Sequence, residues 1–426
     1  MTWELEPPRL YARTVLVDDL GDLTARLPST EAFAWLRGGD GMIGAGELVR
    51  HKSVSMTDAQ QWWSEQLATS VIESELVDGE LPGSGLVAFG AFVFDPDNSG
   101  DQSTLIVPRT VVGRRDGRCW LTRIDTEPIE PAAMTRAGLP PAAPVRAPRD
   151  VTFADGGLSR DDWKVVVAEA VRRIGNPDAD VPLAKVVLAR SVLASAAEEL
   201  DPRWLVRQLA SEYARCWTYL VDGLVGATPE MLLRRVNGLA TSRVLAGTIR
   251  RSGDDQQDLA LAAALAESSK DLEEHEYAVS SVARALAAHC SGMNVPDAPY
   301  VLQLPNVLHL ATDVTAVAGG SSLALAAALH PTAAVCGTPT QLARATIAEL
   351  EHLDRGRYAG PVGWVDARGD GEWAIALRGG QIDHQDPRQI RLFAGCGIVA
   401  GSDPAAELAE STAKLLPMHS ALTTTP

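Results

Sequence analysis

The chain has 426 residues with 38 basic and 55 acidic side chains, so its formal net charge is −17 and its pI is near 4.9. This balance argues against nucleic acid or an anionic membrane as a partner, because a basic field attracts such polymers. The sequence has no apolar run of 18 residues and its N-terminus does not resemble a secretory signal. Five dispersed cysteines without CxxC spacing are typical of a reducing compartment, so we expect a cytoplasmic protein.

The first half of the chain reads as strands and hairpins with few helices. Strand patterns cover 85–94 and 103–108, and a helical pattern covers 59–76. Residues 127–149 are rich in proline and alanine and have the character of a linker. Taken alone, this linker favours a division into two domains.

The second half alternates long helical patterns with strands. The helical patterns cover 160–174, 203–215, 257–291, 321–330 and 338–350, and a further helix begins at Pro404. The strand patterns cover 181–193, 217–225 and 390–399, with two strands in 229–250 joined at Asn237-Gly238 and a hairpin over 361–378. This mixture predicts an α+β fold with large, mostly antiparallel sheets.

The apolar strand 181–193 contains Lys185, one of only five lysines in the chain. Alternation along the strand places Lys185 and Val187 on the same face. Desolvation lowers the pKa of a buried amine, which is how a lysine becomes a general base near neutral pH. The segment is equally compatible with a lysine that reaches solvent at the end of the strand.

Glu230 follows Pro229 at the start of an apolar stretch, where apolar neighbours raise the pKa of a carboxyl and fit it to act as an acid. Further along, Gly247 allows a ligand to approach the backbone and Thr248 offers a hydroxyl, with positive charge from Arg250 and Arg251. Without other support, Glu230 reads as a solvated residue and the Gly-Thr pair as an ordinary turn.

Two helices carry glutamates that could bind a metal. Glu274 lies off the apolar stripe of its helix, which we expect Ser269 or Asp271 to cap. Glu407, Glu410 and Lys414 share one face of the last helix, after a glycine-rich strand exit at 395–397 whose N–H groups suit a carboxylate. Carboxylates from two helices suit Mg²⁺. The same residues are also compatible with roles that need no metal. Glu274 would then lie on a solvated acidic face, and Glu410 and Lys414 would form an ion pair on the surface.

Taken in order, these segments resemble the chorismate-utilising enzyme family, and most closely its isochorismate synthases. The resemblance spans about 160–418 and rests on KVVLAR (185–190), TPE (228–230), LAGTIRR (245–251), SSKDLEEH (268–275), NVLHLAT (306–312), HPTAAVCGTP (330–339), RYAGPVGWVDARGDGEWAIALR (357–378) and AGCGIVAGSDPAAELAESTAKL (394–415). Residues 88–95, AFGAFVFD, match loosely. Ala333 departs from the family, which usually has proline there.

The resemblance implies one large α+β domain over 1–426, with two facing sheets and outer helices, and so replaces the two-domain interpretation of the linker. The first 150 residues or so would form a less recognisable N-terminal subdomain, and about 160–418 the motif-bearing part. The site would lie in a cleft between the subdomains.

The resemblance also implies roles for individual residues. Lys185 matches the general base that activates a water, and Glu230 matches the acid for the departing C4 hydroxyl of chorismate. Glu274 and Glu410 match the ligands of Mg²⁺, with Glu407 orienting the metal shell. The residues that match substrate contacts are Gly247, Thr248, His309, Ala334, Tyr358, Arg378, Gly395 and Lys414.

Three alternatives stay open within this family: an ammonia-using synthase, a salicylate synthase and a non-catalytic paralogue. Anthranilate and aminodeoxychorismate synthases use ammonia from an amidotransferase and lack the water-activating lysine, so Lys185 argues against them and against an obligatory amidotransferase subunit. Salicylate synthases also eliminate pyruvate and commonly have threonine at the position of Ala334. A non-catalytic paralogue would be expected to lose Lys185, Glu230 or a metal ligand.

Overall fold

The computed structural model describes residues 8–76, 81–134, 144–176, 181–304 and 307–424, without the side chains of Lys270 and Glu274. The helices in this part are α1 (Met56–Thr69), α2 (Arg160–Ile174), α3 (Pro202–Glu212), α4 (Asp255–Glu267), α5 (Ser269–Ala287), α6 (Ser322–Leu329), α7 (Thr340–Leu350) and α8 (Pro404–Thr423), with short 3₁₀ helices at Leu23–Arg26 and Pro131–Ala133. None of the helices in the described residues is both long and apolar enough to span a membrane.

The strands of the first 155 residues are β1 (Tyr11–Val17), β2 (Ala32–Arg37), β3 (Asp40–Ser53), β4 (Val71–Ser74), β5 (Val87–Ala91), β6 (Ser103–Arg115), β7 (Arg118–Asp125) and β8 (Thr152–Asp155). The remaining strands are β9 (Lys185–Ser195), β10 (Trp217–Val221), β11 (Leu224–Thr228), β12 (Met231–Val236), β13 (Leu239–Arg250), β14 (Cys290–Asn294), β15 (Tyr300–Gln303), β16 (Val307–Ala318), β17 (Gly337–Thr338), β18 (Pro361–Asp366), β19 (Gly371–Ile375), β20 (Gly379–Ile382) and β21 (Gln389–Ile398).

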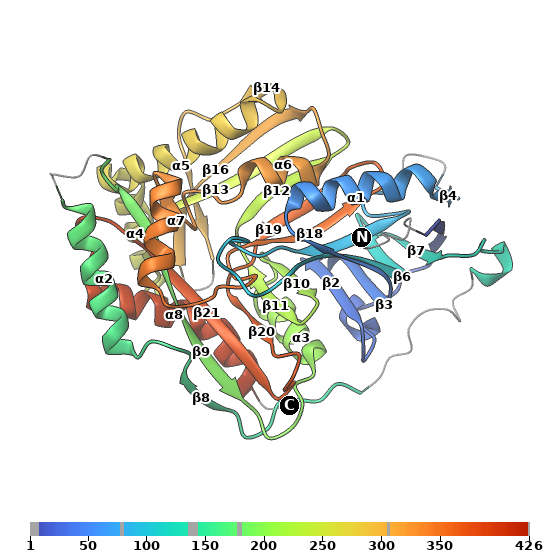
Figure 1. Cartoon of the computed structure of the whole chain (residues 1–426), viewed down its shortest axis with the longest axis horizontal. Helices are drawn as coiled ribbons and strands as arrows, with labels where there is room; N and C mark the ends of the chain where they lie inside the picture. Colours follow the sequence, from blue (N-terminus) through green and yellow to red (C-terminus); the bar gives the residue numbers. More distant parts are fainter. Residues whose placement is uncertain (1–7, 77–80, 135–143, 177–180, 305–306, 425–426) are drawn as a thin grey trace, which may run out of the picture.

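Within the described residues, hydrogen bonds link 21 strands, and every pairing is antiparallel except that of β1 with β4. Helices lie outside the sheet (Figure 1), so the predicted α+β class with large, mostly antiparallel sheets is confirmed. Strands from the first 150 residues pair with later ones, β2 with β10 and β5 with β18. From these pairings we propose that the whole chain forms one domain.

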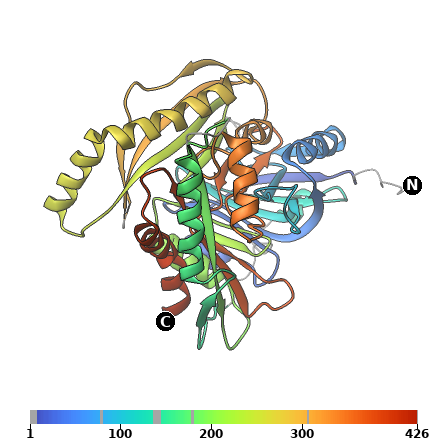
Figure 2. The ribbon, with the colours of Figure 1, turned by 60° about the vertical axis from the view of Figure 1, so that its left-hand side comes forward.

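Two groups of helices cover different parts of the sheet. Helices α2, α7 and α8 pack against β9 and β21, whereas α5 packs against β13 and β16. Figure 2 shows α2 and α7 side by side, where Arg173 of α2 pairs with Glu349 of α7. Six tryptophans are almost completely buried in the core: Trp35, Trp63, Trp120, Trp163, Trp364 and Trp373. Burial of this apolar surface therefore stabilises the sheet that carries the site.

The sequence predicted several boundaries wrongly. The expected single helix over 257–291 is two helices, α4 and α5, and the cap of α5 is Ser268, whose side chain accepts a hydrogen bond from the Asp271 N–H, rather than Ser269 or Asp271. The expected strand over 217–225 is the hairpin β10–β11, with positive φ at Asp222 and Gly223. The expected helix over 59–76 ends at Thr69 and is followed by β4. In each case a local turn or cap interrupts a continuous apolar pattern.

Candidate active site

A cavity of about 230 Å³ lies among β9, β13, β16, β21 and α8, and has room for one small ligand. Twelve of the thirteen site residues predicted from the sequence line it: Lys185, Glu230, Gly247, Thr248, His309, Ala334, Tyr358, Arg378, Gly395, Glu407, Glu410 and Lys414. The thirteenth, Glu274, lies on α5, and its side chain is outside the described residues. Helix α5 nevertheless reaches the cavity, because Asp271 contributes to its wall.

Lys185 is the first residue of β9 and lies opposite Thr338 of β17. Lys185 and Val187 both line the cavity, as the alternation predicts. The amine of Lys185 is therefore placed at the wall by a strand that is buried over most of its length.

Glu230 occupies the short connection between β11 and β12. Its backbone N–H donates to Thr228 Oγ1 at 3.2 Å, and its carbonyl oxygen accepts from the Ile375 N–H at 3.0 Å. Burial raises the pKa of its carboxyl to about 7, although Lys185, Lys414 and Arg378 act in the opposite direction. A carboxyl that titrates near neutral pH can donate a proton during a reaction.

A bulge in β13 places Thr248 beside His309. Gly247 has φ +81°, and the pairing of β13 with β16 shifts by one residue at this point. Thr248 Oγ1 lies 2.9 Å from Nδ1 of His309. Burial, reinforced by Arg378 and Lys414, lowers the pKa of His309 to about 3, so its imidazole is neutral. Among the described residues its Nε2 has no hydrogen-bond partner, which leaves a polar atom for a ligand.

Helix α8 contributes charged groups to the cavity wall. Asp403 caps the helix and Pro404 is its first residue, as predicted. Lys414 Nζ lies 2.6 Å from Glu410 Oε1 and donates to the Gly395 carbonyl oxygen at 2.8 Å. Burial would raise the pKa of Glu410, but Lys414 outweighs it and lowers that pKa. The predicted ion pair therefore exists, but it lies in the cavity wall instead of on an outer surface.

The same helix carries residues that could hold a metal ion. Ligand atoms of Cys396, Glu407 and Glu410 lie within 4.8 Å of one another. Burial raises the pKa of Glu407, and the nearby Glu410 carboxylate adds to this effect. Two repelling carboxylates beside a cavity fit a divalent cation that binds through oxygen, such as Mg²⁺.

Arg378 and Tyr358 complete the wall. Arg378 lies between β19 and β20 with φ 51°, in the left-handed region that few residues other than glycine adopt. Its guanidinium stays charged even though burial lowers its pKa. The Tyr358 ring stacks on Phe393, with centroids 5.0 Å apart and planes at 10°. A side chain at Gly395 would come within 3.2 Å of the Tyr358 hydroxyl, so glycine keeps this corner open.

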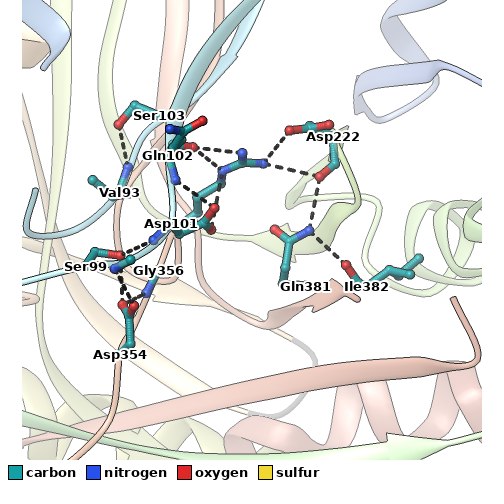
Figure 3. A network of polar contacts seen from close by, with 12 residues as sticks. Val93, Ser99, Asp101, Gln102, Ser103, Asp222, Asp354, Gly356, Gln381 and Ile382 are labelled. Atoms are coloured by element: carbon teal, nitrogen blue, oxygen red, sulfur yellow. Dashed lines mark hydrogen bonds and ion pairs between the residues drawn. The ribbon is translucent and has the colours of Figure 1, made fainter. Parts of the chain in front are cut away.

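A polar network holds the segment that carries Tyr358. Arg357 donates to the Gln102 carbonyl oxygen at 2.8 Å and pairs with Asp222 at 2.9 Å. Asp354 accepts hydrogen bonds from Ser99 and Gly356 in the same network, which Figure 3 shows from close by. The first half of the chain thus supports a wall of the cavity from outside.

The lining residues that sequence reasoning did not assign to the site include Asp271, Arg355, Phe393 and Ser402. Arg355 follows Glu351 by four residues, a spacing that could have suggested an ion pair. The charges expected from Arg250 and Arg251 are not part of the wall. Arg251 instead pairs with Asp258 of α4 at 2.7 Å.

Comparison with known sequences points to one family. The family model described as chorismate binding enzyme matches residues 30–423. The isochorismate synthase DhbC of Bacillus subtilis is 39% identical over 276 residues, which cover 62% of this chain and 68% of that protein. A protein of Mycobacterium tuberculosis named putative isochorismate synthase MenF is 37% identical over 354 residues, which cover 80% of this chain and 87% of that protein.

Solved structures agree with the sequence comparison. The menaquinone-specific isochorismate synthase MenF of Escherichia coli has a TM-score of 0.81 and 26% identity, with 98% of this chain and 95% of that chain covered. The putative 2,3-dihydroxybenzoate-specific isochorismate synthase of Bacillus anthracis has a TM-score of 0.75 and 29% identity, covering 94% of this chain and 98% of that one. The relatives are named as isochorismate synthases, which are isomerases. Because the family model and the fold match over nearly the whole chain, the protein belongs to the chorismate-binding enzyme family.

Proposed function

We propose that the protein is an isochorismate synthase, which interconverts chorismate and isochorismate by attack of water at C2 and loss of the C4 hydroxyl. The observation that carries this proposal is the meeting of Lys185, Glu230 and Arg378 in one cavity with the carboxylates of α8. A reaction that moves a hydroxyl needs one base, one acid and a grip on two carboxylates.

In this proposal Lys185 accepts a proton from the attacking water, and Glu230 gives a proton to the hydroxyl that leaves. The pKa of Glu230, about 7, supports the second role, because a substantial fraction of the carboxyl is protonated at neutral pH. Each proton transfer then has its own side chain.

The remaining wall residues bind and orient the substrate. Arg378 and Tyr358 hold the enolpyruvyl carboxylate, with Lys414 and the Gly395 backbone beside them. The bulge at Gly247 and Thr248 lies near the ring carboxylate, and Ala334 lies against the substrate. The unpartnered Nε2 of His309 offers a hydrogen bond to a neutral group, because a neutral imidazole adds no charge to the site.

Mg²⁺ is part of the proposal, with Glu274, Glu407 and Glu410 as the residues that would hold it. When bound, it would neutralise the ring carboxylate of the substrate. The neighbouring carboxylates of Glu407 and Glu410 support this assignment.

The alternative activities are less well supported. Lys185 is present, so water is the expected nucleophile and we propose no amidotransferase subunit. Ala334 offers no hydroxyl, which favours release of isochorismate over elimination of pyruvate.

We also propose that the protein works in the cytoplasm. Relatives named for menaquinone and for vibriobactin leave menaquinone and siderophore synthesis as alternative destinations of the product.

The decisive experiment is incubation of the protein with chorismate and Mg²⁺, followed by chromatographic separation of products and a coupled measurement of pyruvate. We expect isochorismate as the early product, and chorismate when isochorismate is supplied. Pyruvate and salicylate in equal amounts from the first time points would identify a salicylate synthase instead. Absence of any conversion would leave the non-catalytic paralogue as the correct interpretation.

A further inference from the structure

Strand β9, which begins at Lys185, has a gap along one of its edges. The edge that faces β21 is paired from Val186 to Ser195. Along the other edge, β17 pairs with Lys185 and Val186, and β8 pairs with Val192–Ser195. In the described part of the chain no strand pairs with residues 187–191 on this edge. Backbone groups buried there need other hydrogen-bond partners.

Backbone groups supply two of these partners, because the Val187 N–H donates to the Cys336 carbonyl oxygen at 2.8 Å and the Ser191 carbonyl oxygen accepts from the Gly156 N–H at 3.0 Å. Side chains supply three others. The Val187 carbonyl oxygen accepts from Arg355 Nη2 at 2.8 Å, and the Ala189 N–H donates to Glu351 Oε1 at 2.7 Å. The Ala189 carbonyl oxygen accepts from Trp163 Nε1 at 3.1 Å. Arg355 and Glu351 therefore take the place of a neighbouring strand at the Val187 carbonyl oxygen and the Ala189 N–H.

The same guanidinium also holds the opposite side of the gap. Arg355 Nη1 donates to the Val335 carbonyl oxygen at 3.0 Å, directly after Ala334. Arg355 Nε donates to Glu351 Oε2 at 2.9 Å, and the Phe94 ring lies 4.2 Å below the guanidinium carbon. The side chains of Arg355 and Glu351 are only 3% and 1% exposed. The Arg355 fork thus joins β9 to the Ala334–Val335 segment, beside the backbone hydrogen bond from Val187 to Cys336.

Stability alone does not account for this pair. Two buried charges lose their hydration, and a well-packed apolar pair often stabilises a protein as much or more. An apolar pair could not bind two carbonyl oxygens and an amide across a strand gap. Arginine can, because its donors lie in a fixed plane, whereas a lysine presents a single nitrogen.

We propose that Glu351 and Arg355 are positioning residues for the active site, an inference that rests on the proposed function. Lys185 lies two residues before Val187 on the same face of β9, so a shift of Val187 moves the amine of Lys185. Misplacement of a reacting group by about 1 Å can cost roughly 10²-fold in rate. Together with the backbone hydrogen bond from Val187 to Cys336, the pair fixes the distance between Lys185 and the wall formed by Ala334 and Val335.

The test is Arg355→Lys, which keeps the buried positive charge beside Glu351 but cannot bind both carbonyl oxygens. We expect kcat for chorismate to fall by about 10- to 100-fold while KM changes less than about threefold, because binding groups elsewhere stay in place. Hydrogen exchange measured by mass spectrometry should become faster in peptides that cover 185–191. Glu351→Gln should show the same pattern and serves as a second variant if the first does not fold.

The matched control is Glu349→Gln, the same substitution two residues away. It breaks an exposed ion pair with Arg173 of α2 and should leave kcat and exchange at 185–191 unchanged. A folded Arg355→Lys variant with wild-type kcat, even at a lower melting temperature, would show that the pair is only structural. Reduced kcat without faster exchange at 185–191 would show that Arg355 acts on the substrate directly, which also overturns the proposal.

The two proposals can fail separately. If the wild-type protein does not convert chorismate, the proposed function is wrong. Exchange at 185–191 in the two variants still shows whether the pair holds β9. Unchanged exchange in both would end the positioning proposal whatever the activity.

Discussion

The cavity residues on the strands and their connections (the strand wall) differ from those on helix α8 (the helix wall) in how their titratable groups are charged. On the strand wall, burial raises the pKa of Glu230 to about 7 and lowers that of His309 to about 3. His309 is therefore neutral, and a substantial fraction of Glu230 is protonated near neutral pH. On the helix wall, Glu410 and Lys414 lie 2.6 Å apart and stay charged, because each compensates the burial of the other. The difference suggests that protons move at the strand wall, whereas α8 binds by charge.

The largest expected effect concerns the helix wall. Removal of divalent metal with a chelator should abolish turnover, and Mg²⁺ should restore it, because the carboxylates of the site repel an anionic substrate without a cation between them. Glu410→Gln should be inactive at any Mg²⁺ concentration tested. Turnover is measured by chromatography before and after addition of the metal. Full activity in excess chelator would remove Glu274, Glu407 and Glu410 from the metal role.

On the strand wall, Lys185→Ala should lower kcat by roughly 10²–10⁴-fold, the usual worth of a positioned proton-transfer group. Folding should be retained, because no large apolar side chain is lost. The control is Lys164→Ala, which removes an exposed lysine of α2 that pairs with Asp161 and should leave kcat unchanged. Steady-state kinetics with circular dichroism compare the two variants. Wild-type kcat in Lys185→Ala would exclude this residue as the base.

Glu230→Gln should also lower kcat by roughly 10²–10⁴-fold. For the wild-type protein, the rate should fall as the pH rises through about 7, because only the protonated carboxyl can act as the acid. This decline should be absent from the residual rate of the variant. A wild-type rate that is constant from pH 6 to 8 would contradict the acid role.

The same group predicts a change in stability. The folded-state pKa of Glu230, about 7, lies above the ordinary value of 4.5, so the folded protein binds more protons between these values. Its contribution to the free energy of unfolding is complete below pH 4.5 and declines as the pH rises to about 7. Glu230→Gln should therefore gain stability relative to the wild type across this range. Urea unfolding at several pH values measures the gain, and a difference that does not vary with pH would show that burial of Glu230 is less complete.

The smallest expected effect concerns the products. Ala334→Thr adds a hydroxyl to the cavity wall and should let a small fraction of turnovers proceed to pyruvate and salicylate, with kcat within about tenfold of the wild type. The control is Ala333→Pro, the residue usual in the family, which should change the stiffness of the loop and leave the product ratio as it was. If pyruvate stays undetectable in Ala334→Thr, this side chain does not decide between the two outcomes.

Much of the local structure was predictable from the sequence. Helix α2 has the bounds that its apolar spacing predicts, and α8 begins at the predicted cap and proline. The hairpin at Asn237-Gly238 also forms as expected. These features depend on a few neighbouring residues, so short-range patterns suffice. The prediction of one helix over 257–291 was wrong because the Ser268 cap, a local signal, lies within a long helical pattern and was overlooked.

The sequence by itself determined which chemical groups the site would contain, because motifs from 185 to 414 carry them in recognisable order. Only the tertiary structure decided how those groups behave. The pKa of Glu230 depends on burial by segments that are distant in the chain, and the partners of Arg355 are backbone groups of β9 and of the Val335 segment. Neither spacing nor composition reports such contacts, since desolvation and strand gaps arise only when the sheet closes around the cavity.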